Sequence, residues 1–439
     1  MNSKIKVAIL SSASGGGAGI AAKRLSDALN QDDKYSADFI DIAATCEALP
    51  NTVTLTENTS NRVYTDTHFT AENTGFIRGW IVSLLCDYDV INVHWASYLV
   101  TTSELIAVAK KGKKILITMH DFYYSTGGCH YQAGCKGQLF SCIGCPQVDT
   151  RYFPYTSVMA AFKEKAELLN YANVHISAPS QYLIDKVVST GIKDAQSAHV
   201  IRNIYQPEEA VFSDKQAVKS HVLLIADSLL ERRKGMALAL EALSLATANF
   251  DGDLIVHLVG YADDQLRKLC SEYKINAVFY GRITEHTKLV KLYQNVGVLV
   301  TCSYEDNWPN ILVEAGAYGV VPVVGSSHGC EEFCKLFNIG RLAQSYTPEA
   351  FSKAIINCIE DYPQYIQLQT YAMNVRLTHS SYKIICAYGK VISAFCDKYS
   401  QTEPSKLFDS VLDKKSNETE GPFSASAFNF SSYGICADL

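Results

Sequence analysis

The chain has 439 residues, 48% of them hydrophobic, and a formal net charge of −6 with a sequence pI near 6.0. Because this length exceeds one typical hydrophobic core, we expect two domains. The acidic balance, without a stripe of clustered Lys and Arg, argues against a nucleic-acid binder, whose affinity depends on basic side chains facing phosphates.

The beginning of the chain predicts a strand and not a signal peptide, because the apolar run that ends at Leu10 is short. No stretch reaches the roughly 18 apolar residues that a transmembrane helix needs. We therefore expect a cytoplasmic protein, either soluble or in peripheral contact with the inner face of the plasma membrane. In that compartment the 14 cysteines indicate reduced thiols, with room for a metal site, more than a disulfide framework.

Apolar runs and helical periodicity alternate through the first half of the chain. Strands are predicted at 5–10, 37–42, 90–94, 115–119, 174–178 and 199–202, and helices at 20–29, 104–110 and 158–171. Such alternation predicts a parallel sheet with helices on both faces. A polar, acidic connector that contains Pro207 follows.

The second half repeats this scheme. Strands are predicted at 222–226, 254–259, 277–280, 296–301 and 320–325, and helices at 236–246, 264–273, 286–293, 310–318 and 348–360. A last strong helix is predicted at 382–398. Beyond residue 399 the composition is polar and without periodicity, which predicts a flexible tail.

The most informative stretch follows the strand predicted at 296–301, and it carries two acids eight residues apart, Asp306 and Glu314. The first amides of the next helix have no internal partner, so this elbow can hold a phosphate while the acids reach neutral hydroxyls. Glu305, Asn307 and Asn310 are further candidates for substrate contact. Acids in the first turn of a helix also serve as simple caps, and the spacing alone leaves both interpretations open.

In context, this stretch resembles the donor-site motif of retaining GT-B glycosyltransferases of the family 4 (group 1) type. Those enzymes usually carry Glu at both ends, whereas here Asp306 takes the first position beside Glu305. The resemblance implies two facing Rossmann-like domains with a C-terminal crossover helix. The expected parts are an acceptor-side domain (1–205) with a cysteine-rich insertion (126–147), a nucleotide-sugar domain (206–380), the crossover helix (381–398) and the tail (399–439).

A glycine run after the first strand contains Gly16 and Gly17, whose bare amides can approach a ligand closely. It matches the dinucleotide fingerprint only weakly, because six residues separate that match from the strand. The run is instead similar to the glycine loop that the N-terminal domain of GT-B enzymes presents to the cleft. A tight connection without function is the alternative.

Two histidines, His94 and His120, follow predicted strands, and the carboxyl ends of such strands form the ligand crevice of an open α/β sheet. A single histidine is usually structural, but two at matching strand ends favour a site. In the resemblance, His120 with Asp121 corresponds to the His-Asp pair that reaches the donor sugar and the acceptor, and His94 is a further substrate contact.

Basic residues stand at the opening of the second domain's first helix, at Arg232, Arg233 and Lys234. An Arg can fork onto phosphate oxygens and a Lys adds a point charge, so these residues are predicted to neutralise a departing diphosphate, although which Arg acts is open. The resemblance also places Arg282 on the nucleotide side and Glu331 in the late glycine-rich segment that ends in Glu.

Four cysteines with close spacing, Cys129, Cys135, Cys142 and Cys145, have His130 alongside. Four thiolates that end in Cys-x-x-Cys suit a structural zinc ion, and reduced packing thiols or a redox pair are the alternatives. The insertion is similar to one in a bacterial subgroup of family 4 enzymes from exopolysaccharide clusters.

The resemblance therefore implies a retaining glycosyltransferase that moves a sugar from a UDP- or GDP-sugar to a glycan or lipid-linked acceptor, in surface or exopolysaccharide biosynthesis. Glu314 would contact the ribose, Asp306 the sugar, and Arg233 with Lys234 the diphosphate. No catalytic cofactor is expected. The rival hypotheses are a GT-B epimerase or phosphorylase, an NAD-dependent oxidoreductase and a non-catalytic scaffold.

Overall fold

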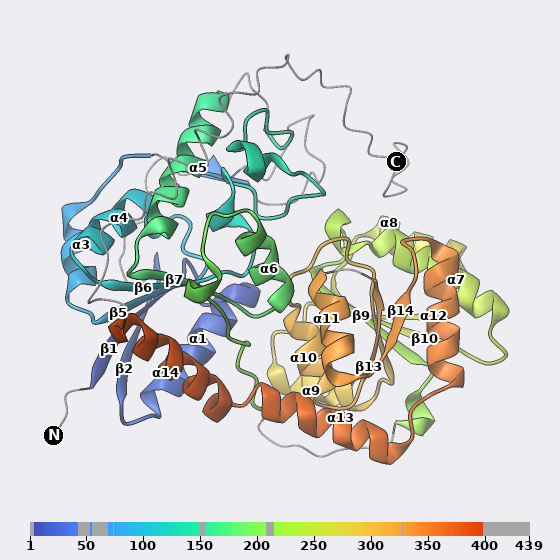
Figure 1. Ribbon diagram of the computed structural model, residues 1–439. Helices are drawn as coiled ribbons and strands as arrows, with labels where there is room; N and C mark the ends of the chain where they lie inside the picture. Colours follow the sequence, from blue (N-terminus) through green and yellow to red (C-terminus); the bar gives the residue numbers. More distant parts are fainter. Residues whose placement is uncertain are drawn as a thin grey trace.

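The computed structural model describes residues 4–42, 53–54, 69–72, 74–148, 154–207, 215–326 and 328–397. These ranges form two lobes, each built around a six-stranded parallel sheet (Figure 1). The predicted pair of Rossmann-like α/β domains is confirmed. The predicted flexible tail, 399–439, lies outside the described residues.

The first lobe has the strand order β2-β1-β5-β6-β7-β8. Its strands are β1 (Ile5–Leu10), β2 (Tyr35–Ile40), β5 (Val90–Val93), β6 (Lys114–Thr118), β7 (Val174–Ala178) and β8 (Ala198–Val200). Its helices are α1 (Gly16–Asn30), α3 (Gly79–Cys86), α4 (Thr102–Lys110), α5 (Tyr155–Asn170) and α6 (Gln181–Ser189). A two-stranded antiparallel ladder joins β3 (Val53–Thr54) to β4 (Thr70–Ala71).

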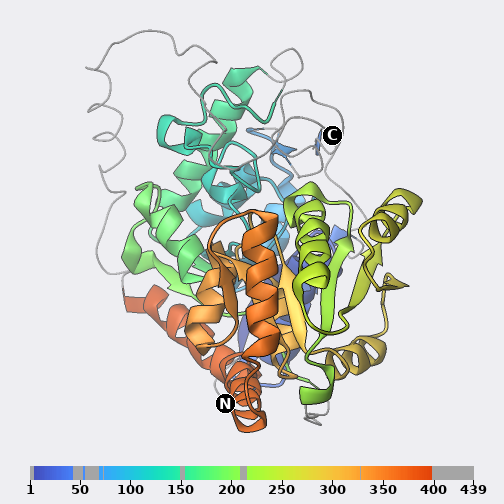
Figure 2. The same ribbon diagram turned by 90° about the vertical axis from the view of Figure 1, so that its right-hand side faces the viewer.

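The second lobe has the order β11-β10-β9-β12-β13-β14. Its strands are β9 (His221–Ser228), β10 (Ile255–Tyr261), β11 (Ala277–Gly281), β12 (Val298–Thr301), β13 (Val321–Gly325) and β14 (Arg341–Ala343). Its helices are α7 (Met236–Asn249), α8 (Asp264–Glu272), α9 (His286–Gln294), α10 (Asn310–Gly316), α11 (His328–Phe337), α12 (Pro348–Glu360) and α13 (Tyr365–Thr378). In Figure 2, where this lobe faces the viewer, α12 (orange) stands in front of the sheet.

The central strands are buried on both faces, which is why they read as continuous apolar runs in the sequence. All four residues of β5, for example, are buried, and so are all four of β12. Helices pack on the two faces of each sheet and bury separate apolar clusters in each lobe. The loops at the carboxyl ends of these strands therefore start from a packed core.

The last helix, α14 (Ser381–Asp397), returns to the first lobe (Figure 1). Its buried Tyr388 and Phe395 belong to the same apolar cluster as Val7 of β1 and Leu25 of α1. The ring of Tyr388 lies edge-on to Tyr35, with centroids 6.1 Å apart. The chain thus crosses between the lobes a second time, and α14 belongs by its packing to the first lobe.

Local signals fix several helix starts. Thr101 and Glu104 form a capping box at the beginning of α4, in which each side chain accepts a hydrogen bond from the other residue's backbone N–H. Thr347 caps α12, whose first residue is a proline. The first helix of the second domain, predicted at 236–246, begins in the structure at Met236 as predicted, and the basic residues 232–234 form a 3-10 turn directly before it.

Across the residues that the structure describes, no helix has both the length and the apolar content that crossing a membrane requires.

Candidate active site

The acidic loop of the second lobe runs from β12 to α10 and carries both predicted acids. Asp306 lies within this loop and Glu314 on α10, and their side chains are 12% and 13% exposed. Pro309 directly precedes the helix in an extended conformation, where its missing N–H costs no hydrogen bond. The acids therefore stand at the carboxyl edge of the parallel sheet, where open α/β sheets bind ligands.

The basic turn at 232–234 lies against this acidic loop. The Nζ atom of Lys234 is 2.7 Å from Oδ2 of Asp306, and Nη1 of Arg233 is 3.7 Å from the same oxygen. Gly235 makes this approach possible, because its φ is +67° and an added Cβ would lie 2.2 Å from the carbonyl oxygen of Cys302. Arg232 is exposed, whereas its neighbour Arg233 is buried.

These cations determine the charge of the Asp306 carboxyl. Burial alone would raise the pKa of Asp306, but Lys234 and Arg233 together bring it below its ordinary value. The carboxylate is therefore ionised at neutral pH and can accept hydrogen bonds from sugar hydroxyls. Of the two cations, Lys234 has a side chain 21% exposed and Arg233 one only 6% exposed, so Lys234 is the more accessible to a ligand.

Glu314 faces the first lobe. Its carboxylate lies 3.2 Å from Nη2 of Arg24 on α1, and it accepts a hydrogen bond of 3.3 Å from the hydroxyl of Tyr293. On the same helix, the amide of Asn310 donates to the carbonyl oxygen of Gly17 at 3.1 Å. The glycine loop and the acidic loop are therefore neighbours, as a site between the two lobes requires.

The glycine loop forms the start of α1. Gly16 has a φ of +70°, a conformation that side-chain-bearing residues rarely adopt. A Cβ atom at Gly17 would lie 3.7 Å from the side-chain nitrogen of Asn310. The loop thus brings backbone amides close to the second lobe.

The two histidines at the strand ends are in contact, with Nδ1 of His94 2.9 Å from Nε2 of His120 and stacked rings 5.1 Å apart. Burial lowers the pKa of His120 to about 4, and burial together with His120 lowers that of His94 well below its usual value. Both imidazoles are neutral at physiological pH. One ring nitrogen must donate and the other accept, which fixes the two tautomers relative to each other.

Asp121 pairs with His130, whose Nδ1 atom lies 2.7 Å from Oδ2 of Asp121. Burial would raise the pKa of Asp121, but His130 and the backbone N–H of Tyr123 bring it below its ordinary value. The Nε2 atom of His130 is 2.9 Å from the hydroxyl of Thr70. Asp121 therefore orients the start of the cysteine-rich insertion.

Three further predicted residues have identified partners. The amide of Asn307 donates to the carbonyl oxygen of His120 at 3.1 Å and so links the acidic loop to the histidine pair. Glu331 pairs with Lys335 on its own helix at 2.6 Å. Arg282 lies 3.3 Å from Asp227 in a solvent-exposed pair, which contributes little to stability.

Sequence reasoning missed the residue next to Glu331. Glu332 accepts hydrogen bonds from the backbone N–H groups of Gln181 and Tyr182 at the start of α6 and lies 2.8 Å from Arg202. It therefore connects α11 of the second lobe to the first lobe, at a helix start that favours an anion. Arg24, the partner of Glu314, was also missed. Neither residue belongs to a motif, so the sequence offered no signal for them.

The four clustered cysteines all have free thiols. Burial raises the pKa of Cys142 to about 11 and that of Cys145 to about 12. Burial and the three other thiols raise the pKa of Cys129 well above its ordinary value. Within the described ranges, no group of three or more His, Cys, Asp and Glu is arranged to hold a metal ion. The structural zinc ion stays a prediction.

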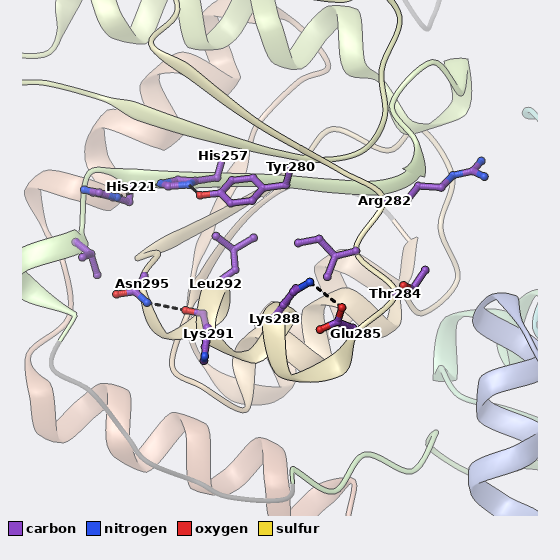
Figure 3. A pocket seen from close by; sticks show the side chains of 12 residues that line it. His221, His257, Tyr280, Arg282, Thr284, Glu285, Lys288, Lys291, Leu292 and Asn295 are labelled. Carbon is purple, nitrogen blue, oxygen red and sulfur yellow. Dashed lines mark hydrogen bonds and ion pairs between the residues drawn. The ribbon is translucent and has the colours of Figure 1, made fainter.

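A separate pocket of about 620 Å³ lies between α9 and the β11 side of the second sheet (Figure 3). Three rings from neighbouring strands, His221, His257 and Tyr280, form one wall, and Nδ1 of His257 is 2.8 Å from the Tyr280 hydroxyl. Leu292 and Lys288 of α9 form the opposite wall. The residues that follow β11, including Arg282, line the same pocket.

Comparison with known proteins agrees with this geometry. Residues 208–375 match the family described as "Glycosyl transferases group 1". The chain is 25% identical over 266 residues to the putative colanic acid biosynthesis glycosyl transferase WcaC of Escherichia coli (strain K12), a match that covers 56% of this chain and 60% of WcaC. The match thus spans less than two thirds of that relative.

Solved structures share the architecture of both lobes. HepE of Anabaena, crystallised in complex with UDP, superposes with a TM-score of 0.59 at 15% identity and covers 89% of this chain and 100% of HepE. A glycosyltransferase from Rickettsia africae ESF-5 gives a TM-score of 0.59 at 12% identity, and the match covers 91% of this chain and 100% of that protein. The fold is therefore that of the GT-B glycosyltransferases. Residues 208–375, which match the group 1 glycosyltransferase family, contain both the acid pair and the basic turn.

Proposed function

We propose that the protein is a retaining glycosyltransferase that moves a sugar from a UDP- or GDP-sugar to a glycan or lipid-linked acceptor, in surface or exopolysaccharide biosynthesis. The observation that carries this proposal is the ion pair of Lys234 and Asp306 on the acidic loop, which leads into the helix that carries Glu314 and contacts the glycine loop through Asn310. The UDP complex of HepE, which has the same fold, supports a nucleotide donor.

In this proposal the chain acts by positioning and by charge. The ammonium group of Lys234 neutralises the diphosphate as the bond to the sugar breaks, which stabilises the leaving group. Asp306 accepts hydrogen bonds from sugar hydroxyls, and Glu314 exchanges its contact with Arg24 for the ribose hydroxyls. An acceptor hydroxyl attacks C1 of the sugar from the face that the diphosphate leaves. Its oxygen forms the new glycosidic bond as the bond from C1 to the diphosphate breaks, and the departing diphosphate takes the hydroxyl proton. The anomeric configuration is therefore retained, and no protein nucleophile is needed.

His120 contacts the sugar or acceptor as a neutral group. Because burial lowers its pKa to about 4, it cannot act as a proton donor in the charged form at neutral pH. A neutral imidazole bonded to His94 can instead accept a hydrogen bond from a hydroxyl or donate one to it. Rate should therefore show no inflection near pH 6.5 that depends on His120.

The test is release of UDP or GDP from a panel of sugar nucleotides, with and without a lipid extract as acceptor. We expect acceptor-dependent release, a product with retained anomeric configuration by proton NMR, and a raised donor KM for Glu314→Gln. Glu272→Gln, an exposed change on α8, is the matched control and should leave KM unchanged. Turnover without an acceptor would favour the epimerase hypothesis, and a requirement for free phosphate would favour the phosphorylase. Binding of NAD alone would favour the oxidoreductase.

A further inference from the structure

The cysteine-rich insertion contacts the second lobe at the acidic loop. The backbone N–H groups of Gln132 and Ala133 donate to the two carboxylate oxygens of Glu305, at 3.2 and 2.8 Å. Glu305 is 7% exposed, so these hydrogen bonds are shielded from water. The insertion thus holds a buried carboxylate that stands one residue before Asp306.

A second contact lies beside this one. The guanidinium carbon of Arg233 is 3.9 Å from the centroid of the Tyr131 ring, close enough for a cation–π interaction. The same guanidinium donates to the backbone carbonyl of Glu305 at 2.7 Å and also bonds Glu231. Arg233 is 5% exposed, and a buried charge requires all of these partners.

The backbone of the insertion is shaped for these contacts. Ala133 has a φ of +49°, an uncommon conformation for a residue with a side chain, and Gly134 follows with a φ of +75°. Consecutive residues in this region turn their N–H groups toward one side, where they bind an anion, here the carboxylate of Glu305. An uncommon backbone conformation such as that of Ala133 persists only where surrounding contacts stabilise it, and such conformations cluster at functional sites.

We propose that residues 126–147 form a wall of the sugar-donor site, held by Glu305, in which Tyr131 is the positioning residue for Arg233. The inference rests on the proposed function above and extends it. Glu305 and Arg233 are the chain neighbours of Asp306 and Lys234, and adjacent Cα atoms are only about 3.8 Å apart. Loss of the insertion's contacts therefore displaces both members of the pair that binds the donor.

This assigns to Glu305 and Arg233 a role different from direct substrate contact. Both side chains are buried by partners from the insertion, whereas Lys234 keeps an accessible ammonium group. Glu305 binds the insertion through its carboxylate, and Arg233 packs on Tyr131 of the insertion. The neighbouring Lys234–Asp306 pair contacts the ligand. The insertion belongs to the first lobe, so the contact also fixes how the acceptor side meets the donor side.

The test measures donor KM, acceptor KM, kcat and the Kd for UDP or GDP of Tyr131→Ala, Tyr131→Leu and Tyr131→Phe. We expect donor KM and Kd to rise about tenfold for Ala and Leu, since both remove the aromatic face, while acceptor KM changes less than about twofold. Phe keeps the face and should stay within about twofold of wild type. Leu preserves most of the volume, so it remains informative if the Ala variant fails to fold.

Two further variants sharpen the result. Glu305→Gln should weaken donor binding in the same direction, and combined with Tyr131→Leu it should cost less than the product of the two single effects, because both act through Arg233. Tyr382→Leu makes the same change at an exposed tyrosine, 80% accessible, on α14 and serves as the control. It should leave donor KM unchanged.

The inference is overturned if folded Tyr131→Leu binds the donor as wild type does, or if Tyr131→Phe is as impaired as Tyr131→Leu. Wild-type protein that binds no nucleoside diphosphate and turns over no sugar nucleotide would instead overturn the proposed function, and this inference with it. The two failures are therefore distinguished by the wild-type measurement alone.

Discussion

Lys234→Ala removes the accessible cation of the candidate donor site. The lost contact is charge-assisted, since Nζ of Lys234 lies 2.7 Å from the Asp306 carboxylate and would meet a diphosphate in the same position. Hydrogen bonds to charged groups contribute about 1.5–3 kcal/mol, which corresponds to a fall in kcat/KM of about 10- to 150-fold. Asp306 keeps Arg233 at 3.7 Å, so the fold should survive.

The assay is nucleoside diphosphate release under kcat/KM conditions, with circular dichroism to confirm the fold. Lys268→Ala is the matched control, because Lys268 is 78% exposed and lies 3.6 Å from Glu272 on the surface of α8. Such pairs contribute little, so this variant should be as active as wild type. Full turnover by folded Lys234→Ala would refute the assignment of the basic turn to the diphosphate.

Three other predictions follow from buried groups. The Nε atom of Arg78 lies 2.8 Å from Oε1 of Glu104, whose side chain is 0% exposed. Glu104→Gln should lower the free energy of unfolding in urea titrations by about 3–5 kcal/mol, because it leaves the buried guanidinium of Arg78 without a carboxylate. A change below about 1 kcal/mol would contradict this prediction. Burial lowers the pKa of His379 to about 4, so the unfolded chain binds a proton at this residue at a higher pH than the folded chain does. The free energy of unfolding should therefore fall by about 3 kcal/mol as pH falls from about 6.5 to 4, with no effect of this residue above that window. His379→Gln should reduce the slope of the free energy of unfolding against pH. If the cysteine spacing reflects a structural site, purified protein should contain about one zinc ion by mass spectrometry and Cys145→Ser should lose it, whereas four thiols that react freely in zinc-free native protein would exclude the site.

The strands were predictable because parallel strands buried on both faces leave apolar runs in the sequence. The structure places β1 and β7 at the predicted residues, and the other predicted strands differ from it only at their ends. The short edge strand β14 was missed, since three residues give no periodicity. Helix α13 was missed because its apolar residues do not form a clear stripe along one face.

The site was predictable only within each lobe. Strand ends located His94 and His120, and the acid spacing located Asp306 and Glu314, because these signals are local. Contacts between the lobes have no local signal: Arg24 and Glu314 are separated by 290 residues along the chain. The attachment of the cysteine-rich insertion to Glu305 also joins residues far apart in sequence, and only the folded chain brings them together.

The most direct test of the account is a thermal-shift titration of the full chain with UDP, GDP, ADP and NAD. A ligand that binds only the folded state raises the melting temperature. At a ligand concentration 100 times its Kd, the free energy of unfolding rises by about 2.7 kcal/mol. The account predicts a saturable rise with UDP or GDP that Lys234→Ala weakens. A rise with NAD alone, and none with any nucleoside diphosphate, would contradict it.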